Sequence, residues 1–369
     1  MKVMIAAKDL ANALAAPVRW AKGEGAARGV LIEAIPEVGL KLVGTDSTTA
    51  VRTNVAFEEA YVSEAGTVLV SARRLYDLVR ALQPETITLH TTDANLGVTG
   101  GNFEGRLSLM PVGNFPALKD VAGRAVVFSV ENFKKAAEQV LPAVSADPRR
   151  KNHQGVLVRV LHDVIVLAAT DGVRVAESRV KIDEHVGEWE GRTNTVVLPP
   201  AVIAEATRGS GNGVLTYSDD NSKVGLATNG LWVSTSPLAI DFPDYSKFMS
   251  TTYDMKFEAS RQGLLTAIGR VNLLADDIAA VRLNIGDDRL VATLKAAAIG
   301  EAHESVSLDT GEAEFESAFN PAMLLAGLQS AGGETVFIHA NQPLRPVLFT
   351  DGNGYKYLLM PVRVAKPGE

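Results

Sequence analysis

The stretch Gly29-Val30-Leu31-Ile32-Glu33 decides the fold prediction for this 369-residue chain, because related stretches follow at a fixed spacing. It returns as Gly155-Val156-Leu157-Val158-Arg159 and again as Ala280-Val281-Arg282-Leu283-Asn284, at offsets of 126 and 125 residues. Leu42-Val43-Gly44-Thr45-Asp46 returns as Leu167-Ala168-Ala169-Thr170-Asp171, at an offset of 125 residues. We infer three copies of a unit of about 123 residues, far longer than the ~20–50 residues of a solenoid repeat.

Segments with helical periodicity recur at the same spacing. Residues 71–82 place four apolar side chains on one face, at the i, i+3, i+4, i+7 spacing of an amphipathic helix. Equivalent helices are expected over 199–208 and 320–331. The last of these has Asn320 as its expected N-cap and Pro321 at its first helical position, both of which favour helix initiation.

Each third of the chain combines few helices with many short strands. The helices that open the thirds are expected over 8–20, 130–144 and 260–274. Short alternating segments predict strands, as in 86–90, 164–167 and 231–235. Turn sequences separate the strands, among them 93–95, 211–213 and 351–354. This pattern favours an α+β fold with a helix pair on antiparallel sheets in each of three domains, 1–122, 123–249 and 250–369.

Composition excludes several classes of protein. With 46% hydrophobic and 21% charged residues, the chain is typical of a globular protein and not of a disordered one. It contains no cysteine, which excludes disulfides, thiolate metal sites and cysteine nucleophiles and is compatible with a reducing cytosol. Asp9 interrupts the first apolar stretch, and no apolar run approaches the ~20 residues of a membrane span. We therefore expect a cytoplasmic protein without membrane contact.

Positive charge is local in a chain whose formal net charge is −7. The first two thirds each carry −1 and the last third carries −5, so nucleic acid can bind only through clusters of basic residues. Any one such residue is typical of a solvated surface. Equivalent helices on one concave surface, however, would present their basic residues together to phosphates, which position a protein without reading sequence. The candidate DNA-binding residues are Arg19, Lys22, Arg73, Arg80, Lys134, Arg149, Arg150, Lys151 and Arg208.

The sequence shows no catalytic or metal-binding motif. Its six histidines lack metal-ligand spacing, and phosphate-loop, nucleophile-elbow and Rossmann patterns are missing. Asp46 and Asp171 occupy the same position in two repeats and could act as paired carboxylates in an enzyme. An aspartate where a strand enters a turn normally caps its own backbone, however. We predict that the protein is not an enzyme and has no catalytic residue, metal or cofactor.

Three segments carry a family resemblance when they are taken in order with the repeat. They are Ala-Thr-Asp-Gly-Val-Arg-Val-Ala at 169–176, Asp-Phe-Pro-Asp-Tyr at 241–245 and Leu-Met-Pro-Val-Arg-Val at 359–364. From residue 1 to about 364, the chain resembles the bacterial-type sliding clamp, the beta subunit of DNA polymerase III. The resemblance implies a head-to-tail ring of two chains, with helices lining the hole and sheets outside.

Such a ring would be a processivity factor. It would encircle duplex DNA, slide along it without sequence preference and tether the replicative DNA polymerase, the clamp loader and other clamp-motif proteins. A duplex DNA-binding protein that forms no ring stays open as the alternative.

The resemblance also implies two sets of site residues. An apolar groove between the second and third domains would bind short partner peptides. Its positions are Thr170, Gly172, Val173, Arg174, Val175, Pro243, Phe248, Leu344, Pro346, Leu358, Met360, Pro361 and Val362. The dimer interface would join an acidic third domain to a nearly neutral first domain. Its positions are Arg74, Arg106 and Leu109 on one chain and Leu273, Glu301 and Glu304 on the other.

Overall fold

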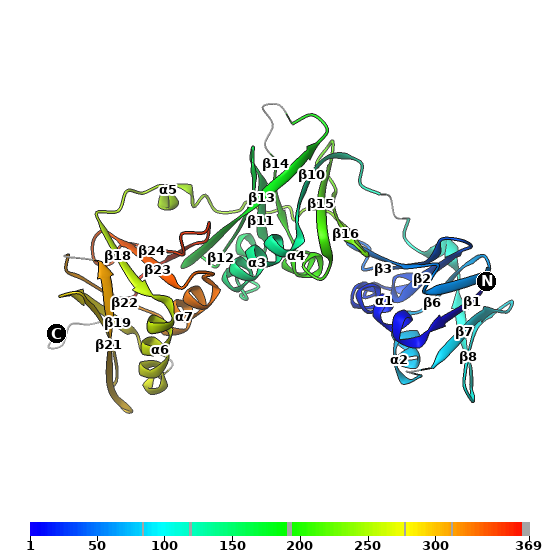
Figure 1. The fold of residues 1–369 in the computed structure, drawn as a ribbon, viewed down its shortest axis with the longest axis horizontal. Helices are drawn as coiled ribbons and strands as arrows, with labels where there is room; N and C mark the ends of the chain where they lie inside the picture. The colour runs from blue at the N-terminus through cyan, green and yellow to red at the C-terminus, as the bar shows by residue number, and fades with distance from the viewer. Residues whose placement is uncertain (83–84, 118–119, 190–193, 277, 311–312, 364–369) are drawn as a thin grey trace. The chain divides into compact units, whose positions relative to one another are not determined.

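The computed structural model describes residues 1–82, 85–117, 120–189, 194–276, 278–310 and 313–363. The chain divides into two compact units, each described here by itself. Unit 1 comprises Met1–Glu131, Ile182–Arg192 and Ala201–Pro237. Unit 2 comprises Asn132–Lys181, Thr193–Pro200 and Leu238–Glu369. Both units combine antiparallel strands with a few helices (Figure 1).

The element order repeats along the chain. The first third contains β1 (Lys2–Ala6), α1 (Ala7–Trp20), β2 (Gly29–Ile35), β3 (Gly39–Thr45), β4 (Ala50–Ala56), β5 (Ala60–Glu64), β6 (Gly66–Ser71), α2 (Ala72–Ala81), β7 (Thr86–Thr91), β8 (Asn95–Gly100) and β9 (Phe103–Met110). The second contains β10 (Gly123–Ser129), α3 (Val130–Val140), β11 (Val156–Val160), β12 (Val164–Thr170), β13 (Arg174–Val186), β14 (Asn194–Leu198), α4 (Pro200–Ala206), β15 (Ser210–Ser218), β16 (Val224–Asn229) and β17 (Leu231–Thr235). The third contains α5 (Ser246–Met249), β18 (Met255–Ser260), α6 (Arg261–Val271), β19 (Val281–Gly286), β20 (Arg289–Ala296), β21 (Gly300–Thr310), β22 (Phe315–Phe319), α7 (Pro321–Ser330), β23 (Thr335–Ala340), β24 (Val347–Thr350) and β25 (Lys356–Leu359).

Strand pairing follows one pattern in all three thirds. The repeated five-residue stretch forms β2, β11 and the start of β19, and each of these strands lies between two antiparallel neighbours. They are β3 and β6, β12 and β14, and β20 and β22. The strand before each opening helix also pairs twice, as β1 does with β5 and β7. The predicted internal repeat is therefore confirmed.

The helices begin close to their predicted positions. Asn320 caps α7, because its side-chain oxygen accepts a hydrogen bond from the Met323 amide at 3.0 Å. Pro17 lies inside α1, which nevertheless continues to Trp20. Helix α3 ends earlier than predicted, and Leu141–Ala143 form a 3-10 turn that contains Pro142. Proline lacks the amide that would continue the α-helix, which explains the change.

One predicted turn is wrong. Gly211-Asn212-Gly213 lies inside β15, where the register with β16 shifts between Ser210 and Val214. Gly211 has a φ of +70°, which glycine adopts without strain. A Cβ atom on Gly213 would lie 2.5 Å from the ring of Phe128. The glycines therefore make a bulge beneath an aromatic ring, which sequence alone does not distinguish from a hairpin turn.

The first repeat buries its core between sheet and helix pair. Leu10 and Leu14 of α1, together with Leu75 and Val79 of α2, are fully buried in one apolar cluster with β2 and β3. Burying such side chains contributes about 1.5–3 kcal/mol each, which holds the helices on the sheet. Within the described ranges, no helix is long and apolar enough to span a bilayer.

Candidate functional site

Two distant segments of the predicted groove meet at a strand pair in unit 2. Strand β25 pairs with the start of β13, so that Leu359 lies opposite Arg174 and Leu358 opposite Val175. The Met360 amide extends the ladder by donating to the Val173 carbonyl at 2.9 Å. We call this region the second junction, because it joins the last strand of the third repeat to the second repeat. It places the segments 170–175 and 358–362 side by side.

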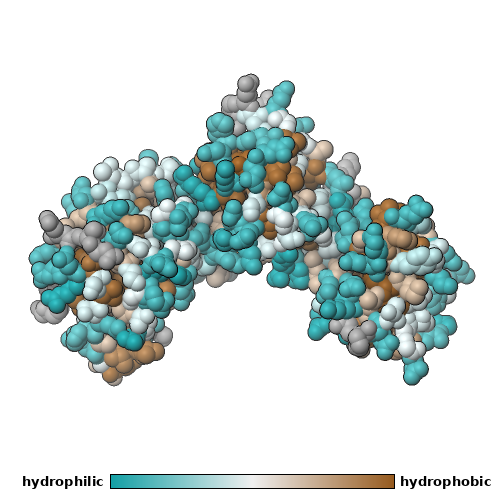
Figure 2. Space-filling view, in the orientation of Figure 1, coloured by the Kyte–Doolittle hydropathy of each residue, from teal (hydrophilic) through white to brown (hydrophobic). Residues whose placement is uncertain are grey.

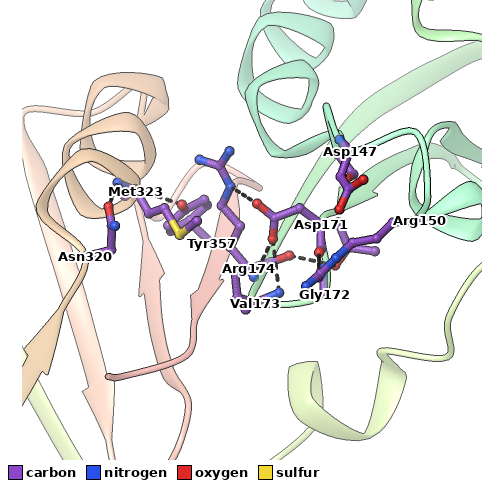
Figure 3. Close-up of polar contacts among 11 residues, drawn as sticks. Asp147, Arg150, Asp171, Gly172, Val173, Arg174, Asn320, Met323 and Tyr357 are labelled. Atoms are coloured by element: carbon purple, nitrogen blue, oxygen red, sulfur yellow. Dashed lines mark hydrogen bonds and ion pairs between the residues drawn. The ribbon is translucent and has the colours of Figure 1, made fainter. Parts of the chain in front are cut away.

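The turn between β12 and β13 is built by Asp171 (Figure 3). Its Oδ1 accepts hydrogen bonds from the amides of Val173 and Arg174, and its Oδ2 accepts one from Arg174 Nε at 2.8 Å. Gly172 has a φ of +92°, and a Cβ atom there would lie 2.8 Å from Nη1 of Arg150. Asp46 caps its own turn in the same way, accepting from the amides at 48 and 49. Both carboxylates therefore cap turns, as the sequence predicts.

Tyr357 fixes the side of the second junction that faces α7. Its hydroxyl donates to the Met323 carbonyl at 2.8 Å (Figure 3), and burial raises its pKa to about 12. A Cβ atom on Gly327 would lie 2.3 Å from the Tyr357 ring. Glycine at this position therefore allows the ring to lie flat against α7.

A buried tyrosine anchors the segment that carries Pro243 and Phe248. The Tyr245 hydroxyl donates to Glu177 Oε2 at 2.8 Å, and burial, with the nearby Glu177 carboxylate, raises the pKa of this tyrosine. Tyr245 belongs to an apolar cluster whose other buried members are Leu157, Ala168, Val175, Val197, Leu348 and Leu358. Val175 and Leu358 are therefore part of the floor and not of the open rim.

Apolar side chains remain exposed around this floor. Phe248 is 48% exposed, Leu344 51% and Met360 39%. Leu344 also adopts a φ of +64°, a strained conformation for a bulky non-glycine residue. Pro346, Pro361 and Val362 are half-buried. Exposed apolar residues beside a preformed apolar floor can bind an apolar peptide.

Sequence reasoning missed the residues that brace the predicted groove positions. Glu177 and Tyr357 were not predicted, because a lone carboxylate or tyrosine in a strand gives no signal of its partner. Tyr245 lies in the 241–245 motif, which was the one available signal. Arg150, predicted to contact DNA, donates to the Asp171 carbonyl at 2.5 Å and is exposed to solvent (Figure 3).

Several other predicted DNA-binding residues have partners inside the chain. Arg19 forms two hydrogen bonds to the buried carboxylate of Glu205, at 2.6 and 3.0 Å, which raise its pKa. Arg149 bonds Asp147 through two nitrogens at 2.9 Å, and Arg73 bonds Asp77 at 2.8 Å. The exposed members of the set are Lys22, Arg73, Arg80, Lys134, Arg149, Arg150, Lys151 and Arg208. Their role in DNA binding stays a prediction.

The predicted interface residues lie at exposed strands and helix ends. Arg74 is exposed on α2, and Arg106 pairs with Glu104 at 3.2 Å on β9. Glu301 pairs with Lys295 at 3.3 Å and Glu304 with Arg270 at 2.7 Å. Leu109 packs partly against the first-repeat core, whereas Leu273 is 81% exposed.

Comparison with known proteins identifies the class. Residues 1–119 match the family model of the N-terminal domain of the DNA polymerase III beta subunit, and residues 247–363 match that of its C-terminal domain. The chain belongs to this family, the beta sliding clamps, as its sequence motifs indicated.

Relatives match along nearly the full chain. The beta sliding clamp of Streptomyces coelicolor is 28% identical, over 99% of this chain and 100% of the relative. That of Chlamydia pneumoniae is 26% identical, over 91% and 90%. Among solved structures, the Bacillus subtilis sliding clamp matches with a TM-score of 0.89 at 21% identity, over 99% of this chain and 100% of that one. The Bartonella birtlesii sliding clamp bound to griselimycin matches with a TM-score of 0.87 at 23% identity, with the same coverage.

Proposed function

We propose that two copies of this chain close head to tail into a ring around duplex DNA. As a member of the sliding clamp family, the protein is a processivity factor of DNA replication. The ring would slide without sequence preference and would tether the replicative polymerase, the clamp loader and other partners through the groove of the second junction. Three clamp domains, 1–122, 123–249 and 250–369, would turn their helices toward the hole. A cytoplasmic location, where bacteria copy DNA, belongs to the same proposal.

Open strand edges carry the proposal of a ring. In unit 1, β17 pairs with β4, and in unit 2, β25 pairs with β13. In both cases the last strand of one repeat joins the fourth strand of the repeat before it. Strand β9 ends the first repeat and β21 is the fourth strand of the third, but neither has the corresponding partner among the described residues. A second copy supplies both partners, and a heterologous contact of this kind can close a ring.

The repeated pairing also predicts the register of the closure. Ser234 lies opposite Ala50, and Leu358 lies opposite Val175. The last strands β9, β17 and β25 pair in the same register with the strands before them. In that shared register, Arg106 of β9 is equivalent to Ser234 of β17 and to Leu358 of β25. By the same comparison, Glu301 takes the position of Ala50 and Val175. The ring would therefore place Arg106 directly opposite Glu301 of the partner subunit, and cross-strand pairs of opposite charge are stabilising.

Neighbouring features agree with this closure. The present partners of Arg106 and Glu301 are exposed residues of the same chain, and such ion pairs contribute little, so they can be exchanged at small cost. Leu273 and Ile278, 81% and 91% exposed, follow α6, and Ile299, 55% exposed, lies in the turn between β20 and β21. Figure 2 shows hydrophobic surface at that end of the third repeat. Closure would remove this surface from water.

The proposal needs no chemistry. Asp46 and Asp171, the candidates for an enzyme, are engaged in their own turns. Among the described residues, no group of three or more His, Asp or Glu could hold a metal ion.

Solution mass and retention on DNA test the ring. We expect light scattering to give twice the 39.2 kDa chain mass. After loading onto a nicked circular duplex, the protein should stay bound and should dissociate once the circle is cut. Arg106→Glu and Glu301→Lys should each weaken the dimer, because they place like charges opposite each other, and the combined charge swap should restore it. A monomeric wild type, or equal retention on linear DNA, would favour the non-ring alternative.

A further inference from the structure

Unit 2 contains a cleft of about 880 Å³ at the second junction, on the side of α3 and α7. Pro142 lines it just beyond the end of α3, and Lys135 lines it from α3 itself. Arg179 and Lys181 line it from β13, and Ala326 lines it from α7. We call it the second-junction cleft. Its volume lies within the range of sites that bind small molecules or short segments of a chain.

Unit 1 contains the equivalent place, and there it is largely closed. We call the region where β17 pairs with β4 the first junction, and its cleft measures about 350 Å³. Arg19 of α1 and Glu205 of α4 line this cleft and bond each other, and Trp20 Nε1 donates to the same carboxylate at 3.1 Å. When α1 is aligned with α3 at their first residues, Pro142 is the equivalent of Arg19. When α4 is aligned with α7 in the same way, Ala326 is the equivalent of Glu205. Proline and alanine cannot make this ion pair, so the second-junction cleft stays open.

Positive charge is added where the ion pair is lost. The three cations of the second-junction cleft, Lys135, Arg179 and Lys181, stand where the first junction has Asn12, Asn54 and Ala56. The repeat thus exchanges neutral residues for basic ones on one wall of the cleft. Cations gathered in an open cleft attract an anion, because phosphate oxygens accept hydrogen bonds from Lys and Arg.

The acidic residues near the cleft offset this charge only in part, because there are three cations and Asp351 is engaged with backbone amides. Asp351 lines the cleft, but its carboxylate accepts hydrogen bonds from the amides of Gly332, Asn353 and Tyr355 and so caps a turn. Arg179 forms an ion pair with Glu177 at 3.4 Å, and the same carboxylate also accepts a hydrogen bond from Tyr245. Glu138 is an exposed residue of the rim.

We propose that the second-junction cleft binds phosphate groups, supplied by the backbone of the duplex that the ring encircles. The inference rests on the proposed function, because that function brings DNA to the helix side of the chain. Lys134, a predicted DNA contact, lies on α3 beside Lys135. The first junction has Asn12, Asn54 and Ala56 in place of the three cations of this cleft, so the two junctions of each chain would hold the duplex unevenly.

Salt dependence tests the cleft. Binding of short duplex DNA is measured against salt for the wild type and for the triple variant Lys135→Gln, Arg179→Gln, Lys181→Gln. Each lost phosphate contact lowers the slope of log K against log salt by about 0.9, so we expect the slope to fall by about one to three. The matched control is Lys2→Gln, Lys223→Gln, Arg289→Gln, which removes the same charge away from the cleft and should leave the slope nearly unchanged.

Two further arms separate the possible outcomes. Pro142→Arg with Ala326→Glu rebuilds the ion pair of the first junction inside the cleft and should lower the slope as the triple variant does. Titration with a nucleoside triphosphate and with inorganic phosphate tests free ligands; tight binding of these with an unchanged DNA slope would overturn the assignment to DNA. Mass and retention on circular DNA are measured on the same samples. If the wild type forms rings but the cleft and control variants have equal salt slopes, the phosphate-binding proposal for the cleft is wrong and the ring proposal stands.

Discussion

The two junctions within the chain share one architecture and differ in what fills it. At the first junction, the helix side is closed by Arg19, Trp20 and Glu205. On its sheet side, the Arg52 guanidinium bonds Asp120 at 2.9 Å and stacks 4.5 Å from the Trp232 ring. A cavity of about 280 Å³ remains there. Side chains of the chain itself therefore occupy much of both sides of the first junction.

The second junction has a larger cleft on its helix side and exposed apolar side chains around its apolar floor. Glu177 stands where the first junction has Arg52, and it holds Tyr245 of the segment that carries Phe248. Exposed Phe248 and Met360 surround the apolar floor, and the cleft lies on the helix side. The comparison teaches that repetition supplies the scaffold, whereas substitutions at equivalent positions decide which junction is cohesive and which is free to bind.

Breaking the ion pair of the first junction should have the largest effect. Glu205→Ala leaves the indole N–H of Trp20 and the half-buried Arg19 guanidinium without their acceptor. Removing one partner of a buried pair costs about 3–5 kcal/mol, and the partial exposure of Arg19 reduces this to about 2–3 kcal/mol. Denaturant unfolding should show the loss, with a smaller one for Glu205→Gln. A midpoint unchanged in Glu205→Ala would show that the pair is not cohesive.

Gly327→Ala should disturb the second junction. The new Cβ would lie 2.3 Å from the Tyr357 ring, so the ring or α7 must move, at a cost of about 1–3 kcal/mol. Gly269→Ala on α6 is the matched control, because nothing lies within 4 Å of its Cβ position. That control should stabilise the protein by about 0.4–1 kcal/mol. Thermal unfolding should show a lower melting temperature for Gly327→Ala and a higher one for Gly269→Ala. Equal shifts of the two variants would contradict the packing of Gly327 against Tyr357.

Met360→Ala should weaken peptide binding at the second junction. Removal of an exposed apolar side chain from the rim is expected to reduce affinity for an apolar clamp-motif peptide by about 1–2 kcal/mol, or roughly 5- to 30-fold. Ser236 takes the equivalent position after β17, and Ser236→Ala should change nothing in the same fluorescence titration. Equal affinity of the two variants would place the peptide elsewhere.

The two turn aspartates should differ slightly. Asp171→Asn loses the ion pair between Asp171 and Arg174, whose side chains are 13% and 15% exposed. Asp46→Asn keeps an Oδ1 that can still accept hydrogen bonds from the same two backbone amides. We expect about 1–2 kcal/mol for Asp171→Asn and less than about 1 kcal/mol for Asp46→Asn. Calorimetry distinguishes them. A larger loss at Asp46 would mean that the Arg174 pair adds nothing.

Local signals made much of the fold predictable. The repeat, the strand that begins at Gly29 and the N-cap Asn320 each depend on residues close in sequence. The bulge that contains Gly211 and Gly213 was not predictable, because Gly213 lies against the Phe128 ring of the neighbouring strand β10, which is distant in sequence. The groove residues were named through family resemblance, and most of the residues that brace them were not.

By itself, the sequence determined three α+β repeats, their helix starts and the turn caps Asp46 and Asp171, because these arise from periodicity and from bonds over two or three residues. Tertiary structure alone decided that Arg19 binds Glu205, 186 residues away, and that Tyr245 binds Glu177, 68 residues away. Such pairs leave no local pattern, since each side chain would look solvated without its partner. The difference between the closed first junction and the open second junction could therefore be recognised only in the tertiary structure.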